Sequence, residues 1–174
     1  HRRLGTFILA ILTTLACGQT IRDPQCGYTA TSSVILKSWN WSMSWKGYGY
    51  PNWWLLNLGA DSIPFESVPV KSVYRDEKSG IKVFKFLPRI SLLLLVGLWR
   101  RGWDWYVRGD GKTPITSRLA VTSTWFSSLL LLATLPMLVL LEPPSLALIP
   151  ALFGLLAVTW KLDQNEVHRR LNRI

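Results

Sequence analysis

A long uncharged run lies near the C-terminus and extends from Leu119 to Leu141. A helix of that length measures about 35 Å, which is enough to cross the roughly 30 Å hydrocarbon core of a bilayer. Pro136 is compatible with such a helix because neighbouring groups in a membrane protein can satisfy the backbone groups that proline leaves unbonded. The run therefore predicts a transmembrane helix.

A second uncharged run follows after a short break. Glu142, Pro143 and Pro144 end the first helix, because proline disfavours helical geometry in the residue before it and lacks a backbone donor. The next run, Ser145 to Trp160, would form a helix of about 24 Å, short for a span but tolerable where the bilayer thins. We predict a transmembrane hairpin over 119–160 and a basic tail over 161–174, with a buried soluble helix as the alternative for the second run. Three small residues could let the two helices pack closely: Ala147, Ala151 and Gly154.

The composition supports lipid as the solvent for part of the chain. Of its 174 residues, 49% are hydrophobic, ten are Trp and only 17% are charged, which is a poor basis for a water-facing surface. The formal net charge of +10 would suggest nucleic acid as the partner of a soluble protein. Because the cations flank apolar runs, we instead interpret them as determinants of topology that meet anionic headgroups. The predicted partners are a lipid bilayer and another membrane or membrane-associated protein, with no nucleic acid.

The N-terminal residues 1–18 have the pattern of a signal peptide or an N-terminal anchor. A basic start is followed by an apolar run that ends in the small residues Ala16 and Gly18. Lipidation of Cys17 is a lesser alternative. If the segment is retained outside the cytoplasm, Cys17 and Cys26 could form a disulfide.

The segment Phe86 to Trp99 is harder to assign. Its longest uninterrupted uncharged run consists of the ten residues after Arg89, which reach about 15 Å, half of a bilayer. We predict a short inserted helix and a basic aromatic loop over 86–118, because a span here would place the basic start, this loop and the basic tail on one side of the membrane. The prediction is an integral protein of a bacterial inner membrane or plasma membrane, with 19–85 extracytoplasmic and the C-terminus cytoplasmic. The alternative keeps 19–118 in the cytoplasm and the N-terminus outside.

Between these helices, residues 19–85 show patterns of β-structure. Trp and Ser or Asn alternate over 38–45, which is typical of a strand with one apolar face. Two further strands are indicated around the polar turn at 76–80, and Pro69 suggests an edge strand. The predicted fold class is therefore integral membrane α+β, with three to four transmembrane or inserted helices and a small β-rich, Trp-rich domain.

Aromatic residues supply the candidate sites. One set could form a binding face for a sugar, a lipid headgroup or a peptide, and the alternative is a small core with an interfacial belt. Its members are Trp39, Trp41, Trp45, Tyr48, Tyr50, Trp53 and Trp54. A second set is predicted to anchor the basic loop at the membrane surface, and it comprises Trp99, Arg100, Arg101, Trp103 and Trp105.

Residues for catalysis do not form a recognisable pattern. The sequence has neither a GxSxG nor an HExxH motif, and His168 lies among the charges of the basic tail. We predict no catalytic, metal-binding or cofactor-binding residues and no cofactor, and we expect a protein that is not an enzyme. The predicted role is that of an accessory, assembly or sensing subunit whose extramembrane domain binds a partner or ligand at the membrane surface.

Two other functions remain open. A transporter or pore subunit would need a polar lining, for which the hydroxyls of 122–124 and 127–128 are the candidates. A membrane-surface enzyme acting on a lipid or sugar would rely on Asp61 and Glu66 as its acids.

Overall fold

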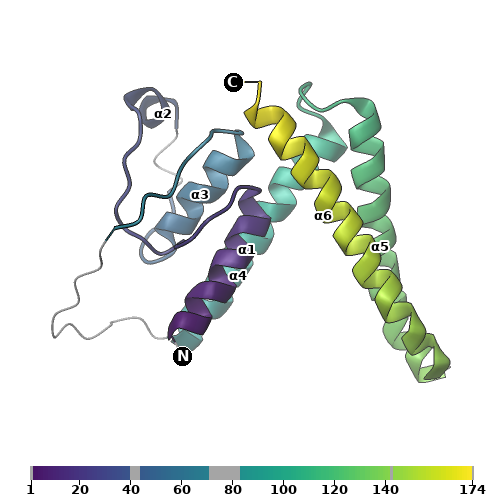
Figure 1. Ribbon diagram of the computed structural model, residues 1–174. Coiled ribbons are helices and arrows are strands. Elements are labelled where there is room, and N and C mark those ends of the chain that lie inside the picture. The colour runs from purple at the N-terminus through teal and green to yellow at the C-terminus, as the bar shows by residue number, and fades with distance from the viewer. Residues whose placement is uncertain (1, 40–43, 71–82, 142, 174) are drawn as a thin grey trace. The chain divides into compact units, whose positions relative to one another are not determined.

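The computed structural model describes residues 2–39, 44–70, 83–141 and 143–173, and these are helical or irregular (Figure 1). The chain divides into two compact units, residues 1–101 and residues 102–174. Each unit has its own hydrophobic core, so the two are described separately.

The described residues of unit 1 form four helices. They are α1 (Arg2–Cys17), α2 (Ser33–Ser38), α3 (Tyr50–Ala60) and α4 (Val83–Gly102), the last of which ends at the boundary of the unit. The Ser32 hydroxyl caps α2 by accepting from the Ile35 amide. Pro51 stands in the first turn of α3, where its missing N–H costs nothing.

Burial follows the helical repeat in α1 and α4. In α1 the buried residues Leu9, Thr13 and Ala16 recur every three or four positions, and in α4 Ile90 and Leu94 do the same. The opposite stripes of both helices are apolar but exposed, and they consist of Phe7, Ile8, Ile11 and Leu12 in α1 and of Leu92, Leu95 and Val96 in α4. Each helix thus has one stripe inside unit 1 and one apolar stripe outside it.

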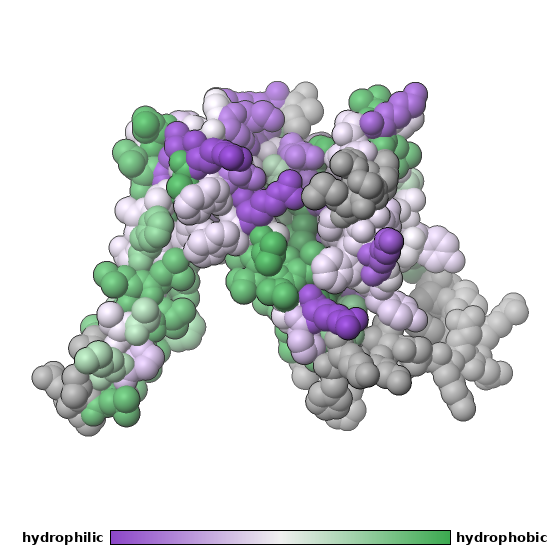
Figure 2. Space-filling model, turned by 180° about the vertical axis from the view of Figure 1, so that it is seen from behind, coloured by the Kyte–Doolittle hydropathy of each residue, from purple (hydrophilic) through white to green (hydrophobic). Residues whose placement is uncertain are grey.

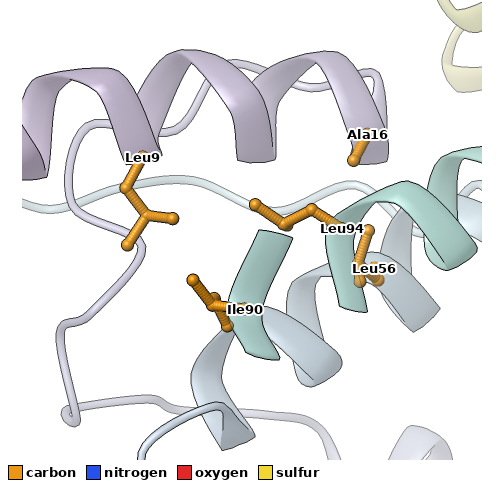
Figure 3. Close-up of a cluster of buried hydrophobic side chains, with 5 residues drawn as sticks. All are labelled: Leu9, Ala16, Leu56, Ile90 and Leu94. Atoms are coloured by element: carbon orange, nitrogen blue, oxygen red, sulfur yellow. The ribbon is translucent and has the colours of Figure 1, made fainter. Parts of the chain in front are cut away.

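The core of unit 1 lies where α1, α3 and α4 meet. Figure 3 shows Leu9 and Ala16 of α1, Leu56 of α3, and Ile90 and Leu94 of α4 pointing toward one another. Two glycines permit this close packing. A Cβ atom at Gly59 would lie 2.3 Å from the Cys17 carbonyl oxygen, and one at Gly97 would lie 2.6 Å from Leu56 Cδ1.

Helices α1 and α4 run in the same direction. Leu9 and Ile90 contact the same core near the beginnings of the two helices. At the other end, Arg101 Nε donates to the Ala16 carbonyl at 3.1 Å and Arg101 Nη2 donates to the Leu15 carbonyl at 3.3 Å. The buried guanidinium satisfies carbonyls that α1 leaves unbonded at its C-terminal end, where the helix dipole favours a cation.

Unit 2 is a helical hairpin with a folded loop at its open end. It contains the π-helix η2 (Trp103–Arg108), α5 (Ile115–Leu141), the short 3-10 helix η3 (Pro143–Leu148) and α6 (Ile149–Leu171). Its core consists of Trp105, Tyr106, Val121 and Val167, which join η2 to the polar ends of α5 and α6.

Ala147, Ala151 and Gly154 are exposed, and Leu152 is the buried residue of that stretch. The small-residue packing face predicted for α6 is therefore wrong.

Two of the described helices are long and apolar enough to cross a membrane. They are Ile115–Met137 and Leu146–Leu171, and only 11% and 6% of their most apolar windows are buried within the structure. Figure 2 shows hydrophobic atoms along the outer surface of this hairpin. The apolar stretch of α1, Gly5–Cys17, is shorter than a span.

The predicted fold class is wrong in two respects. The described residues contain no β-strand, so the β-rich domain is replaced by the helices of unit 1. The count of three to four transmembrane or inserted helices is also not supported, since two of the described helices are candidates for spans. Helix α4 is 20 residues long but carries cations toward both of its ends. Residues 40–43 and 71–82, where much of the predicted strand pattern falls, lie outside the described residues.

Helix α3 shows why the sequence pattern did not reveal the helical structure of unit 1. Its sequence YPNWWLLNLGA is apolar around the whole helix, so its burial carries no helical period that could be seen in the sequence. Gly49 and Pro51 belong to residue types that are common in turns, but here they stand at the beginning of this helix.

Candidate functional site

The most highly organised polar structure of the described residues is a charge cluster at the open end of the hairpin in unit 2. Its members are Asp110, Thr113, Glu166, Arg169 and Arg170, and we call it the charge cluster. Arg170 is at its centre, with a side chain that is 3% exposed. It holds Asp110 by two hydrogen bonds, from Nη1 to Oδ2 at 2.6 Å and from Nη2 to Oδ1 at 2.9 Å. This planar two-point pairing suits a guanidinium and fixes the loop to the end of α6.

Glu166 links the two arginines. Its carboxylate accepts from Arg170 Nε at 3.0 Å and from Arg169 Nε at 2.8 Å, and Arg169 Nη2 also donates to it. Arg169 Nη2 continues to the carbonyl oxygen of Lys112 at 2.6 Å, and Arg170 also donates to the Thr113 hydroxyl. Both carboxylates of the cluster are therefore engaged on both oxygens.

Aromatic residues of η2 close the cluster on its inner side. The Arg170 guanidinium carbon lies 3.8 Å from the centroid of the buried Trp105 ring, which is a cation–π arrangement. The Tyr106 hydroxyl donates to Asp163 Oδ1 at 2.7 Å. Arg118 caps the end of η2 by donating to the carbonyls of Tyr106 at 3.1 Å and Val107 at 2.7 Å.

The pKa of Asp110 reflects this environment. Burial alone would raise it, but hydrogen bonds from Arg170 and from the backbone of Lys112 and Thr113, together with the arginine charge, hold it below its ordinary value. The carboxylate is thus stabilised as an anion. A group that is charged and fully engaged is a poor general base, so the cluster is suited to holding the fold and not to proton transfer.

A hollow of about 170 Å³ lies beside the charge cluster, between α5 and α6. Its lining combines two apolar residues with polar ones, and consists of Ser117, Val121, Leu162, Asn165, Glu166 and Arg169.

Unit 1 contains the second candidate, an aromatic cluster that joins α3 to the residue after α2. We define it as Trp39, Tyr50, Trp53 and Trp54. The Trp39 ring lies 4.5 Å from Trp54 and 5.9 Å from Trp53, edge to face in both cases. Tyr50 lies 6.1 Å from Trp53 and 5.9 Å from Trp54. These distances are within the range in which aromatic pairs attract.

Burial differs within the aromatic cluster. Trp54 is 4% exposed and belongs to the core, whereas Trp39, Tyr50 and Trp53 are half-buried. The cluster therefore has an inner anchor and an outer surface of three rings.

The other residues of the predicted binding face lie apart from this cluster or outside the described residues. Trp45 is exposed, and its ring occupies the space beside Gly49. Tyr48 is exposed as well, and Trp41 lies outside the described residues. The structure thus brings together four of the seven predicted residues.

The predicted interfacial anchors also divide. Trp99, Arg100 and Trp103 are exposed, as an anchor at a membrane surface requires. Arg101 and Trp105 are buried, and they serve the packing of unit 1 and unit 2 respectively. Charge and aromaticity alone could not separate these two groups.

Cys17 and Cys26 are thiols in the structure, and no disulfide joins them. Cys17 is buried, with its sulfur 3.2 Å from the Gln19 carbonyl oxygen. Cys26 is partly exposed. The disulfide stays a prediction.

The residues considered for the other two functions are also placed. Hydroxyls of α5 donate to carbonyls of the same helix, as Ser123 and Thr124 do to Ala120 and as Ser128 does to Thr124. Such bonds reduce the polar character of these three side chains, whereas the Thr122 hydroxyl makes no hydrogen bond within the described residues. Asp61 and Glu66 are both exposed, and the part of the chain that the structure describes holds no group of three potential metal ligands.

Comparisons of the chain with protein-family models, with curated proteins and with solved structures found no match.

Proposed function

We propose that this chain is an accessory or assembly subunit held in a membrane by the hairpin of α5 and α6, and that the aromatic cluster of unit 1 binds a partner protein. The observation that carries the first part is the apolar surface of the hairpin. Two helices of span length leave nearly all of that surface unburied, which is costly in water and favourable in lipid.

The charge cluster supports this role for the hairpin. A pair of apolar helices gains little from packing against each other in lipid, because lipid tails are as apolar as the side chains. The bonds from Arg170 and Arg169 to the preceding loop fix the open end of the hairpin independently of that packing. The subunit would then present a rigid polar end at the membrane surface.

The aromatic cluster supports the binding part. Tryptophan and tyrosine provide large contact area at a small cost in side-chain entropy, and they are enriched where interfaces are strongest. Trp39 and Trp53 are the half-buried members that meet edge to face. A partner that covers them would bury apolar area already ordered by the fold.

The experiment replaces Trp39 and Trp53 with Ala in the full chain and captures bound proteins from native membranes in mild detergent. We expect a partner present with the wild type to be lost, while membrane integration is retained. The control is Tyr28→Ala, which removes an aromatic ring that is 88% exposed and outside the cluster. Equal recovery of the same partner with both variants would contradict the binding role.

A further inference from the structure

Helices α1 and α4 carry an unusual combination of charge and exposure. Within Arg2–Cys17 and Val83–Gly102 there are six cations and no Asp or Glu. The exposed stripe of each helix is apolar, with Ile11 and Leu95 as central members that are 45% and 60% exposed. An apolar stripe flanked by cations is typical of helices that lie in the interface of a membrane.

The lengths of the apolar runs argue against spans. The uncharged run of α4 extends from Ile90 to Trp99 and reaches about 15 Å, half of the hydrocarbon core. The apolar stretch of α1, Gly5–Cys17, is shorter than a span as well. Cations or polar residues flank the apolar run of each helix at both ends. This arrangement favours a helix that lies along the membrane surface.

The parallel packing of the two helices adds a topological argument. The contacts of Arg101 with Leu15 and Ala16 place the C-terminal ends of α1 and α4 together. If both helices crossed the bilayer, the chain between them would have to cross it in the opposite direction. Between α1 and α4, the longest described helix is α3, Tyr50–Ala60, which at about 16 Å is too short to do so.

The face opposite to the exposed stripes is already occupied. Leu56 of α3 packs against Gly97 of α4, and Gly59 of α3 approaches Cys17 of α1. Helix α3 therefore covers the inner side of the pair, where Leu56 meets the core residues of α1 and α4 (Figure 3). The apolar stripes of α1 and α4 are exposed and do not belong to this core. Arg89 is exposed at the beginning of the α4 stripe, where an anionic headgroup could meet it.

We propose that the α1 and α4 pair is a docking surface for an anionic lipid leaflet, with both helices lying along the membrane. The exposed stripes contact the boundary between headgroups and acyl chains. The exposed cation Arg89 of α4 meets the lipid phosphates.

The experiment places the full chain in vesicles and measures the depth of single fluorescent labels. Because Cys17 is 1% exposed, we expect it to remain unlabelled in the folded protein. In a Cys26→Ser background, Ile11→Cys and Leu95→Cys each carry the label. Lipids with a nitroxide near the headgroup or near the chain end quench it. A label at Leu130→Cys in α5 reports the hairpin separately, and one at Val34→Cys in α2 is the control outside the pair.

We expect the labels at 11 and 95 to be quenched more by the shallow nitroxide than by the deep one, and the label at 34 to be quenched by neither. Stronger quenching by the deep nitroxide would show a span, and quenching by neither would place the pair outside lipid. Either result overturns the proposal. The label at 130 tests a separate question. Strong quenching of it by the deep nitroxide would show that the hairpin spans the bilayer, whatever the result for the α1 and α4 pair.

The charge requirement is tested with vesicles of phosphatidylcholine containing increasing phosphatidylserine. We expect Arg89→Gln to shift the half-maximal quenching at position 95 to a higher fraction of phosphatidylserine. The control is Arg108→Gln, which removes an exposed cation of unit 2 and should leave the midpoint unchanged. Quenching that is independent of phosphatidylserine, or equal shifts with both variants, would overturn the anionic preference.

Discussion

Arg170 is the residue on which the folded end of unit 2 most depends. One guanidinium contacts Asp110, Thr113 and Glu166 and lies over Trp105. Removing a buried cation leaves its partner carboxylates uncompensated, which costs more than the pairing itself contributes.

Replacement of Arg170 by Met is expected to destabilise unit 2 by roughly 3–5 kcal/mol. The buried Glu166 loses one of the two arginines that bind it, and Asp110 loses the guanidinium that binds both of its oxygens. The measurement is chemical unfolding in detergent, followed by the near-ultraviolet signal to which Trp105 contributes. Arg108→Met is the matched control. Its ion pair with Asp104 spans 3.7 Å and its side chain is 78% exposed, so we expect a loss below about 1 kcal/mol. Similar losses for both variants would contradict a structural role for the charge cluster.

Asp110 gives the same region a dependence on pH. Because the pKa of its carboxyl is lower in the folded state, the group contributes stability above its unfolded pKa of about 4, and this contribution is lost as the pH falls through the folded value. Unfolding of unit 2 should therefore require less denaturant below about pH 4. Asp110→Asn should lower the stability of unit 2 at neutral pH and reduce the loss of stability below about pH 4. Asp61→Asn, at an exposed position, should leave the dependence of stability on pH unchanged. If Asp110→Asn lost as much stability at acid pH as the wild type does, Asp110 would not be the source of this pH dependence.

At the scale of elements, unit 1 depends on two close helix contacts made through glycine. The contacts differ in what a new methyl group would meet. At Gly59 it would meet the backbone carbonyl of Cys17, and at Gly97 it would meet the end of the Leu56 side chain. A backbone atom cannot move without moving its helix, whereas a leucine side chain can change its rotamer.

We therefore expect Gly59→Ala to lower the thermal midpoint of unit 1 clearly and Gly97→Ala to lower it less. The control is Gly154→Ala in α6, where no atom lies within 4 Å of the new methyl group. This change should be neutral or stabilising by up to about 1 kcal/mol, since alanine favours a helix over glycine. Thermal unfolding followed by circular dichroism measures all three. A smaller effect at Gly59 than at Gly97 would show that α1 and α3 do not approach as described.

At the scale of the whole molecule, the hairpin determines where the chain resides. Leu132 lies in the middle of α5 and is 56% exposed. Leu132→Arg should reduce membrane integration, because an arginine at the centre of a membrane helix costs roughly 2.5–3.5 kcal/mol. The fraction that resists alkaline extraction from membranes is the readout. Val68→Arg, at a residue that is 74% exposed and outside the helices, should not change this fraction, and equal extraction of both variants would argue against a span.

The sequence was sufficient to predict the two long helices of the hairpin, because uncharged runs of this length, broken by two prolines, strongly favour a pair of apolar helices. It was insufficient for unit 1, where Trp and Ser alternate before a helix, α3, that is apolar on all sides. The aromatic cluster was predicted in part, since four of the seven residues proposed for the binding face meet.

The charge cluster was missed because Arg169 and Arg170 resemble a solvated tail. Glu166, three and four positions before them, was the only local signal of pairing. Asp110, separated from Arg170 by 60 positions, could not be recognised as a partner without the fold.

The contact between Arg101 and the end of α1 has a consequence for synthesis. The two groups are separated by 85 positions in the chain. At 5–20 residues per second, a ribosome needs roughly 4–17 s to add that much chain. During this interval the last carbonyls of α1 must be satisfied by water or by another molecule. Helix α1 is therefore completed only after α4 has been synthesised, and a factor that shields nascent apolar helices has this interval in which to bind it.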